Sequence, residues 1–154
     1  MNKLSVLQNV KTVFTHPYPH ICIDEALPQS VYDELDSTFP EELICSTTPH
    51  DGGICYRYKA KECAQEAPPA IWQDFFAYHT SQEYFQECAR LFEPHIVEAY
   101  GDEFMHDMLT KDVSVRDVDT GGHYVADCQF VVHEPVDSSG TSRTPHVDNP
   151  VEIY

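Results

Sequence analysis

Hydrophobic side chains recur at helical spacing near the start of the chain. Pro28 suits the first position of a helix and Pro40 ends the pattern, so residues 28–39 are predicted to be helical. The apolar face of this helix consists of Val31, Tyr32, Leu35 and Phe39. Just before it, Ile21 and Ile23 alternate with other residues, which predicts a short strand.

Two more helices are predicted between residues 70 and 92. Ile71, Phe75 and Tyr78 lie on one face of the first, which covers residues 70–78. Thr80 and Glu83 have the spacing of a capping box, so the second helix is expected to open at Thr80. The residues expected to face inward are Tyr84, Phe85, Cys88, Leu91 and Phe92.

Prolines and glycines separate these helices from their neighbours. Pro94 predicts a kink or a new helix, and Gly101 predicts a C-terminal cap. Residues 45–69 contain paired glycines and paired prolines without a sustained period. They are therefore predicted to be irregular, with a short strand at "ICYRYK", residues 54–59.

After about residue 109 the pattern changes to period two, with many β-branched residues. The runs "KDVSVRDV" and "GGHYVADCQFVVHEPV" predict two strands, and "DTGG" at residues 119–122 predicts the turn of an antiparallel hairpin. The final "VEIY", residues 151–154, predicts the beginning of another strand. We therefore expect an α+β fold in one domain over residues 1–154, with a helical part at about 24–108 and a strand part at about 109–154.

The charge of the chain limits the classes of partner. Its 154 residues include 26 acidic and 9 basic side chains, which gives a formal net charge of −17. Because such a field repels phosphates, nucleic acid and anionic membrane surfaces are not expected as partners. The acidic residues are spread along the chain, which also fits an ordinary solvated surface. No apolar run has the length of a signal peptide or a membrane span, so a cytoplasmic protein is expected.

The six cysteines show neither a C-x-x-C pair nor zinc-finger spacing with histidine. The chain is large enough to form a core without disulfides, so most of the thiols are expected to be buried as small hydrophobic groups. A zinc site built from cysteine and histidine remains an alternative.

The segment "TPHVDNPVEIY", residues 144–154, contains a candidate metal site. In an extended backbone His146 and Asp148 point to the same side, so both can reach one ion. An imidazole and a carboxylate are two parts of the 2-His-1-carboxylate triad that holds non-haem Fe(II). With 9 histidines in 154 residues, about one histidine would have an aspartate two positions later by chance. The surrounding sequence therefore decides how strongly this pair indicates a metal site.

That context is a resemblance to a known family. The segment "PYPHICIDEALPQSVYDELDSTFP", residues 17–40, resembles the N-terminal signature of Fe(II)- and 2-oxoglutarate-dependent oxygenases related to the prolyl hydroxylases. This signature is an aromatic-Pro entry, a short strand, an acidic residue, a Leu-Pro step and a helix ending in Phe-Pro. "TSQEYFQECARLF", residues 80–92, resembles a later helix, and "TPHVDNP" falls where the family has its H-x-D motif.

The resemblance implies a double-stranded β-helix, a jelly-roll-like barrel, with His146 and Asp148 as Fe(II) ligands and 2-oxoglutarate as co-substrate. The substrate would be a peptidyl side chain or a small molecule. The family's second metal-binding histidine, and the basic residue that binds the far carboxylate of 2-oxoglutarate, lie several strands beyond the motif, and residues 149–154 contain neither. The chain thus resembles a dioxygenase truncated after H-x-D, with an incomplete barrel and no expected activity alone.

Other interpretations remain open. The chain could be a non-catalytic, acidic binding or assembly module that keeps the helical half and part of the sheet. An incomplete barrel leaves open strand edges, so a homo-oligomer is expected, formed through "VEIY" or through residues 124–132. His123 and His133 are interpreted as structural, and Arg143 as a loop cation.

Overall fold

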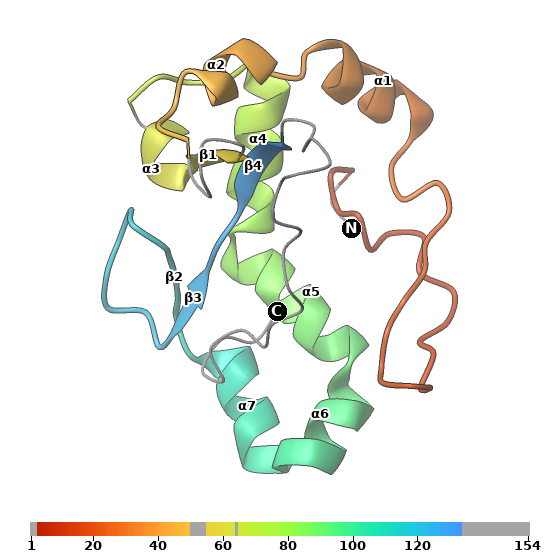
Figure 1. Cartoon of the computed structure of the whole chain (residues 1–154). Coiled ribbons are helices and arrows are strands. Elements are labelled where there is room, and N and C mark those ends of the chain that lie inside the picture. Colours follow the sequence, from red (N-terminus) through yellow and green to blue (C-terminus); the bar gives the residue numbers. More distant parts are fainter. Residues whose placement is uncertain (1–2, 50–54, 64, 134–154) are drawn as a thin grey trace, which may run out of the picture.

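The computed structural model describes residues 3–49, 55–63 and 65–133, and it contains both helices and strands (Figure 1). Helices precede most of the strands, as expected. In chain order the elements are α1 (Gln29–Ser37), α2 (Glu41–Cys45), β1 (Cys55–Lys59), α3 (Ala60–Cys63), α4 (Ala70–His79), α5 (Gln82–Leu91), α6 (Glu93–Tyr100), α7 (Asp102–Thr110), β2 (Val113–Val115), β3 (Tyr124–Ala126) and β4 (Gln129–His133).

The four strands form two separate pairs. β1 and β4 are antiparallel, with Cys55 opposite His133 and Lys59 opposite Gln129. β2 and β3 are parallel, so the expected antiparallel hairpin at residues 119–122 is wrong. The connection between them turns twice, with positive φ at Asp117 (62°) and again at Gly121 (105°), and this returns the chain to its original direction. Within the described ranges no strands close into a barrel.

Helix α4 is packed on two sides and passes through the middle of the molecule (Figure 1). Trp72, near its start, packs against both groups of buried side chains, and its indole Nε1 donates to the carbonyl of Leu35 at 3.1 Å. One group contains Leu4, Val31, Leu35, Ile71 and Tyr78. The other contains Ile44, Tyr58, Ala60, Phe76 and Phe130. The sequence predicted only the first of these faces.

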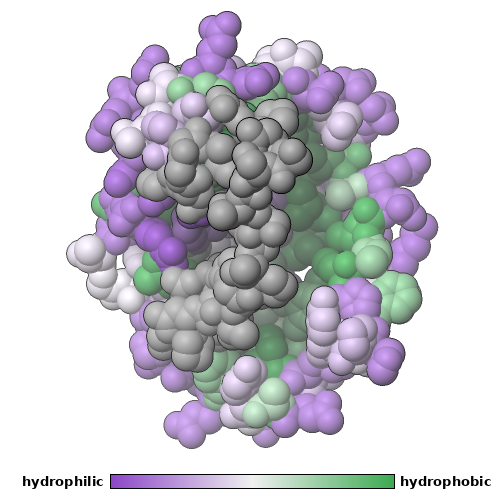
Figure 2. Space-filling model, in the orientation of Figure 1, coloured by the Kyte–Doolittle hydropathy of each residue, from purple (hydrophilic) through white to green (hydrophobic). Residues whose placement is uncertain are grey.

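A third group of buried residues joins the last helices. Ala89 of α5 packs against Met105 and Met108 of α7, with Phe85, Ile96 and Tyr124 partly buried around them. In the view of Figure 2, hydrophilic residues lie around much of the rim, and hydrophobic ones are visible to the right of the centre. None of the helices in the described part is long and apolar enough to cross a membrane.

Several helix boundaries follow the predictions and one does not. Gly101 ends α6 with φ at 89°, and Pro94 lies in the first turn of α6, as expected. The N-cap of α5 is Ser81, whose hydroxyl accepts from the Tyr84 amide at 3.1 Å, and not Thr80. The Thr80 hydroxyl instead donates to the carbonyl of Phe76 at 2.9 Å, so it closes the preceding helix.

The N-terminal segment is less regular than expected. Ile21 and Ile23 do not form a strand, and the only pairing nearby in the described residues is an isolated bridge between Phe14 and His20. Tyr32 of α1 is 55% exposed, although the helical pattern placed it on the apolar face. The buried face of α1 is therefore narrower than its sequence suggests.

His79 ends α4 in a largely aromatic environment. Its ring centroid lies 3.9 Å from that of Phe75 and 4.4 Å from that of Tyr84. Its Nδ1 bonds to the carbonyl of Phe75 at 2.8 Å, which places the ring proton on Nδ1, and its buried Nε2 has no hydrogen-bond partner among the described residues. Burial lowers the pKa of His79, although the Phe75 carbonyl and the negative charge of Glu87 act in the opposite direction.

We expect Phe130→Ala to lower the free energy of unfolding by about 3–5 kcal/mol, because it leaves a cavity among packed rings. The Phe130 ring centroid lies 4.9 Å from that of Trp72 and 5.1 Å from that of Phe76. Urea denaturation measures the change. Tyr32→Ala is the control, and removal of this exposed ring should change stability by only about 0.5 kcal/mol. Equal effects of the two variants would contradict the assignment of the core.

We expect acidification to destabilise the wild type more than His79→Gln. Because folding lowers the pKa of His79, the unfolded chain binds a proton more readily. The stability linked to neutral His79 is thus present above the ordinary value of 6.5 and is lost as pH falls below it toward the folded pKa. Thermal unfolding of both proteins between pH 8 and about pH 5 measures this. His106→Gln, at an exposed site, controls for loss of a titratable ring.

Candidate functional site

The predicted iron ligands lie beyond the last described strand. His146, Asp148 and the nearby Arg143 are outside the residues that the structure describes, and so is the expected strand "VEIY". The chain reaches them from β4, which ends at His133. Among the described strands, β4 is therefore the one nearest in sequence to the H-x-D motif.

One face of this strand pair packs against helices. On the covered face, Tyr58 and Phe130 pack against Ile44 of α2 and Phe76 of α4. Because side chains alternate along a strand, the partners at every second position point the other way. We call this second side the outer face, and it consists of Cys55, Arg57, Lys59, Gln129, Val131 and His133.

One end of the outer face holds a thiol beside an imidazole. Sγ of Cys55 lies 3.8 Å from Nε2 of His133, its cross-strand neighbour, and Cys55 is completely buried whereas His133 is exposed. His123 is not near this pair in the strand register; its amide donates to the Asp112 carbonyl at 2.8 Å and its ring lies 4.9 Å from that of Tyr124. Each of these histidines thus contacts a strand residue, and their interpretation as structural stays a prediction.

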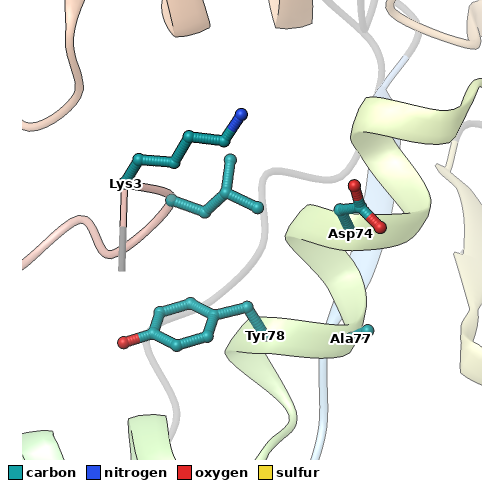
Figure 3. A pocket seen from close by; sticks show the side chains of 5 residues that line it. Lys3, Asp74, Ala77 and Tyr78 are labelled. Atoms are coloured by element: carbon teal, nitrogen blue, oxygen red, sulfur yellow. The ribbon is translucent and has the colours of Figure 1, made fainter. Parts of the chain in front are cut away.

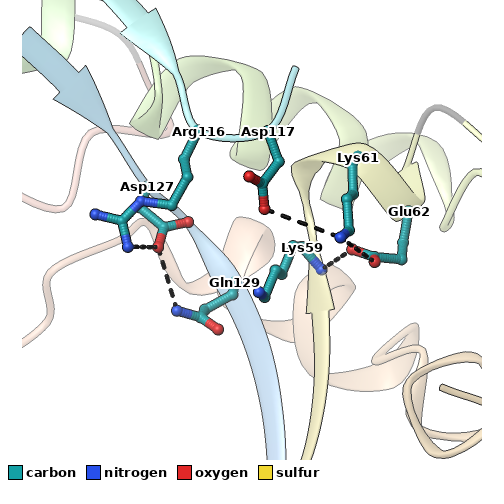
Figure 4. Close-up of polar contacts among 7 residues, drawn as sticks. All are labelled: Lys59, Lys61, Glu62, Arg116, Asp117, Asp127 and Gln129. Carbon is teal, nitrogen blue, oxygen red and sulfur yellow. Dashed lines mark hydrogen bonds and ion pairs between the residues drawn. The ribbon is translucent and has the colours of Figure 1, made fainter. Parts of the chain in front are cut away.

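The other end of the outer face is polar, as Figure 4 shows. Lys59 lies opposite Gln129, and the Gln129 amide nitrogen donates to Asp127 Oδ2 at 3.4 Å. The same Asp127 oxygen forms an ion pair with Arg116 at 3.3 Å. The backbone amide of Lys59 donates to the Glu62 carboxylate at 2.9 Å. Charged and amide groups are therefore concentrated where β1 leads into α3.

The partly buried thiols have raised pKa values, so little of the reactive thiolate forms at neutral pH. Burial raises the pKa of Cys63 and Cys88, and it raises the pKa of Cys128 to about 12. Burial likewise raises the pKa of Tyr58 to about 12, and the Tyr58 hydroxyl donates to the Glu66 carbonyl. Because the thiolate is the reactive form, these groups are not suited to nucleophilic catalysis at neutral pH.

The described residues offer no complete metal site. No three side chains of histidine, cysteine, aspartate or glutamate are grouped so that they could hold an ion within residues 3–49, 55–63 and 65–133. Cys55 and His133 supply two such atoms, 3.8 Å apart. Any iron site of the expected kind would thus depend on His146 and Asp148, whose imidazole and carboxylate match two of the three ligands.

Two hollows lie in the helical half. The first, of about 440 Å³, is lined by Lys3 and Leu4 of the N-terminal segment and by Asp74, Ala77 and Tyr78 of α4, and Figure 3 shows Lys3 on the side opposite Asp74. The second, of about 720 Å³, follows the α1–α2 connection and the segment 66–69, and it contains Glu41, Glu42 and Glu66. The hydroxyls of Ser37, Thr38 and Ser46 in the second hollow donate to backbone carbonyls and not to a glutamate carboxylate, so we assign no reaction to either hollow.

The outer face was not predicted, although part of its signal is in the sequence. The run "CYRYK", residues 55–59, alternates tyrosine with Arg57 and Lys59, which is the pattern of a strand with aromatic residues inward and cations outward. The sequence does not show which strand pairs with β1. Gln129 is opposite Lys59 only because β1 pairs with β4, which lies about 70 residues later in the chain.

The chain was compared with known proteins at three levels. It matches no protein-family model, no curated protein and no solved structure.

Proposed function

We propose that the chain provides the helical support, the first strands and two iron ligands of an Fe(II)- and 2-oxoglutarate-dependent dioxygenase. Its substrate would be a peptidyl side chain or a small molecule. The observation that carries this proposal is the order of three motifs: the entry segment at 17–40, the helix at 80–92 and the H-x-D motif at 144–150. Each motif alone is weak, but all three occur in the order that the family requires.

The arrangement of the described elements supports the proposal. The second half of the entry segment forms α1, and the middle motif forms α5. The β1–β4 pair packs one of its faces on helices. An enzyme that holds its metal inside a barrel needs such a pair, because the face turned away from the supporting helices can line the site.

His146 and Asp148 would hold the iron, and the bound iron with 2-oxoglutarate would supply the oxidising chemistry for hydroxylation. Two protein ligands bind Fe(II) weakly, because common solutes offer the same donor groups. The family's second histidine and its basic residue have no counterpart among residues 149–154. A site of the family's kind would also include these two groups.

We expect weak Mn(II) binding that depends on the H-x-D motif. His146→Ala and Asp148→Ala should each weaken the tightest Mn(II) site by at least about tenfold, since even second-shell substitutions at metal sites cost that much. Electron paramagnetic resonance of free Mn(II) measures the affinity. His106→Ala, which removes an exposed histidine of α7, is the matched control.

Acidic surfaces bind Mn(II) non-specifically, so the result depends on the difference between variants. Equal affinity of wild type, His146→Ala and His106→Ala would contradict the proposed ligands. Succinate formation from 2-oxoglutarate with Fe(II) and ascorbate should stay at background for the 154-residue chain. Turnover that His146→Ala abolishes would rule out a non-catalytic module and would show that no further ligand is required.

A second candidate function is a non-catalytic acidic module that binds or assembles. The observation that favours it is a set of exposed valines on or beside the strands: Val125 of β3 is 54% exposed, Val131 of β4 39%, and Val118 in the turn after β2 53%. In the described part of the chain β3 pairs only with β2, and β4 pairs only with β1, so each has an open edge. Open edges with apolar side chains tend to pair with another chain.

We expect the chain to form a homo-oligomer through these strand edges. Size-exclusion chromatography with light scattering should show a dimer or larger species at micromolar concentration, and Val125→Lys should shift it toward monomer because an edge lysine opposes strand pairing. Tyr100→Lys is the control, since Tyr100 is 67% exposed but lies on α6, away from the strands. A monomeric wild type would contradict assembly through these edges.

A further inference from the structure

The hollow of about 440 Å³ lies between the N-terminal segment and α4 (Figure 3). Two contacts hold the N-terminal side in place. Leu4 is 4% exposed and packs in the same buried group as Tyr78, and the buried Ser5 donates its hydroxyl to Glu87 Oε2 of α5 at 2.7 Å. Because the residues that follow it are anchored in this way, the Lys3 side chain begins at a defined place beside the hollow.

The other side of the hollow is one face of α4, made of Asp74, Ala77 and Tyr78. Residues three and four apart in a helix lie on the same face, so these side chains are neighbours. Ala77 is exposed, and its methyl group leaves space that a longer side chain would occupy. Burial raises the pKa of Tyr78 to about 12, so its ring is uncharged at neutral pH. Leu4, Ala77 and Tyr78 therefore form an uncharged floor.

Two opposite charges stand on opposite sides of this floor. Among the described residues that line the hollow, only Lys3 and Asp74 are charged, and Figure 3 shows them apart from one another. Neither forms an ion pair within residues 3–49, 55–63 and 65–133. Both are exposed, so a ligand can reach them. The hollow thus offers one cation and one anion, separated by uncharged side chains.

The volume of the hollow limits how far apart the two charges of a ligand can lie. A sphere of 440 Å³ would be roughly 9 Å wide, a size at the small end of ligand sites. In an α-amino acid the N–Cα–C unit measures about 2.5 Å and a C–O bond about 1.2 Å. With a charged hydrogen bond of about 2.8 Å at each end, the span is roughly 9 Å as well. A peptide, whose terminal charges lie further apart, does not match this span.

We propose that this hollow binds a free α-amino acid with an apolar side chain. Its ammonium group lies against Asp74, its carboxylate against Lys3, and its side chain against the floor. A zwitterion has no net charge, so the field of a chain of net charge −17 neither attracts nor repels it. A simple carboxylic acid is repelled by this field, and a simple amine is attracted to acidic surface anywhere on the molecule. Selection of the zwitterion therefore depends on the two local charges.

The inference goes beyond the proposed function, because binding at this hollow needs neither iron nor the H-x-D motif. It is tested in metal-free buffer with chelator, which removes any metal that an amino acid could bind. The probes are leucine and three of its relatives. 4-Methylpentanoate lacks the ammonium group, and 3-methylbutylamine lacks the carboxylate. 6-Aminohexanoate is an isomer of leucine with the same two charges at opposite ends of the carbon chain.

The experiment follows the backbone amide NMR signals of residues 3–5 and 74–78 during titration at low ionic strength, where exposed charges are least screened. Leucine should shift these signals. 4-Methylpentanoate, which has lost one ionic contact, and 6-aminohexanoate, whose charges are too far apart, should each bind about fivefold more weakly. 3-Methylbutylamine should shift signals over much of the acidic surface, and Lys3→Gln should not weaken its binding.

Two substitutions test the charges. Lys3→Gln and Asp74→Asn should each weaken leucine binding about fivefold, the most that an exposed ion pair usually contributes. Lys11→Gln and Asp36→Asn are the matched controls. They remove an exposed lysine and an exposed aspartate that do not line the hollow, and they should leave leucine binding unchanged.

Two further variants test the space and the orientation. Ala77→Leu should fill the hollow and weaken leucine binding although both charges remain, and its exposed position should leave the fold intact. The dispersion of the amide spectrum shows whether each variant is folded. Combining Lys3→Asp with Asp74→Lys should restore the binding that either reversal alone removes, because the zwitterion can bind in the reverse orientation.

Leucine shifts that keep their midpoint in folded Lys3→Gln and Asp74→Asn variants, or that lie away from residues 3–5 and 74–78, would overturn the inference. So would tighter binding of 6-aminohexanoate than of leucine, or the absence of shifts up to roughly 50 mM leucine, a concentration that detects even very weak binding. These outcomes are separate from the Mn(II) measurements on His146→Ala, so the amino-acid site and the oxygenase proposal can fail independently.

Discussion

The packing of α4 on two sides is the constraint on which the rest of the structure depends. Ile71 and Tyr78 bury one side against α1 and the N-terminal segment, Phe76 buries the other against β1 and β4, and Trp72 contacts both groups. A helix with one apolar stripe would lie on the surface of the molecule, but a helix that is apolar on two sides must lie between layers. This position of α4 decides which face of the strand pair packs on the helices.

The register between β1 and β4 then decides which side chains lie on the outer face. Tyr58 is opposite Phe130, and their rings stack with centroids 6.2 Å apart on the covered face. A shift of one residue would bury Lys59 in place of Tyr58 and would turn the aromatic ring to the outer face. The same aromatic contacts that stabilise the core therefore fix Lys59 and Gln129 side by side on the other face.

The sequence predicted the local parts of the fold and missed the pairing of distant ones. The helical periods of α1, α4 and α5, the strand at β1 and the cap at Gly101 all follow from neighbouring residues, and the structure confirms them. Alternating burial through Tyr124, Ala126, Cys128 and Phe130 also follows the period of two. The parallel β2–β3 pair and the β1–β4 pair depend on packing between distant segments, which no local pattern records. His146 and Asp148, found through sequence resemblance, stay predictions because they lie outside the described residues.

The net charge of −17 acts in opposite directions on the two small partners of the proposed oxygenase. An acidic chain concentrates divalent cations near its surface, so the field favours the approach of Fe(II). The co-substrate 2-oxoglutarate is an anion and meets the opposite field. Lys61 and Arg116 do little to offset this field, because each is paired with a carboxylate. In the proposed oxygenase, binding of the far carboxylate of 2-oxoglutarate would therefore depend on a dedicated basic residue, as it does in the family that the chain resembles.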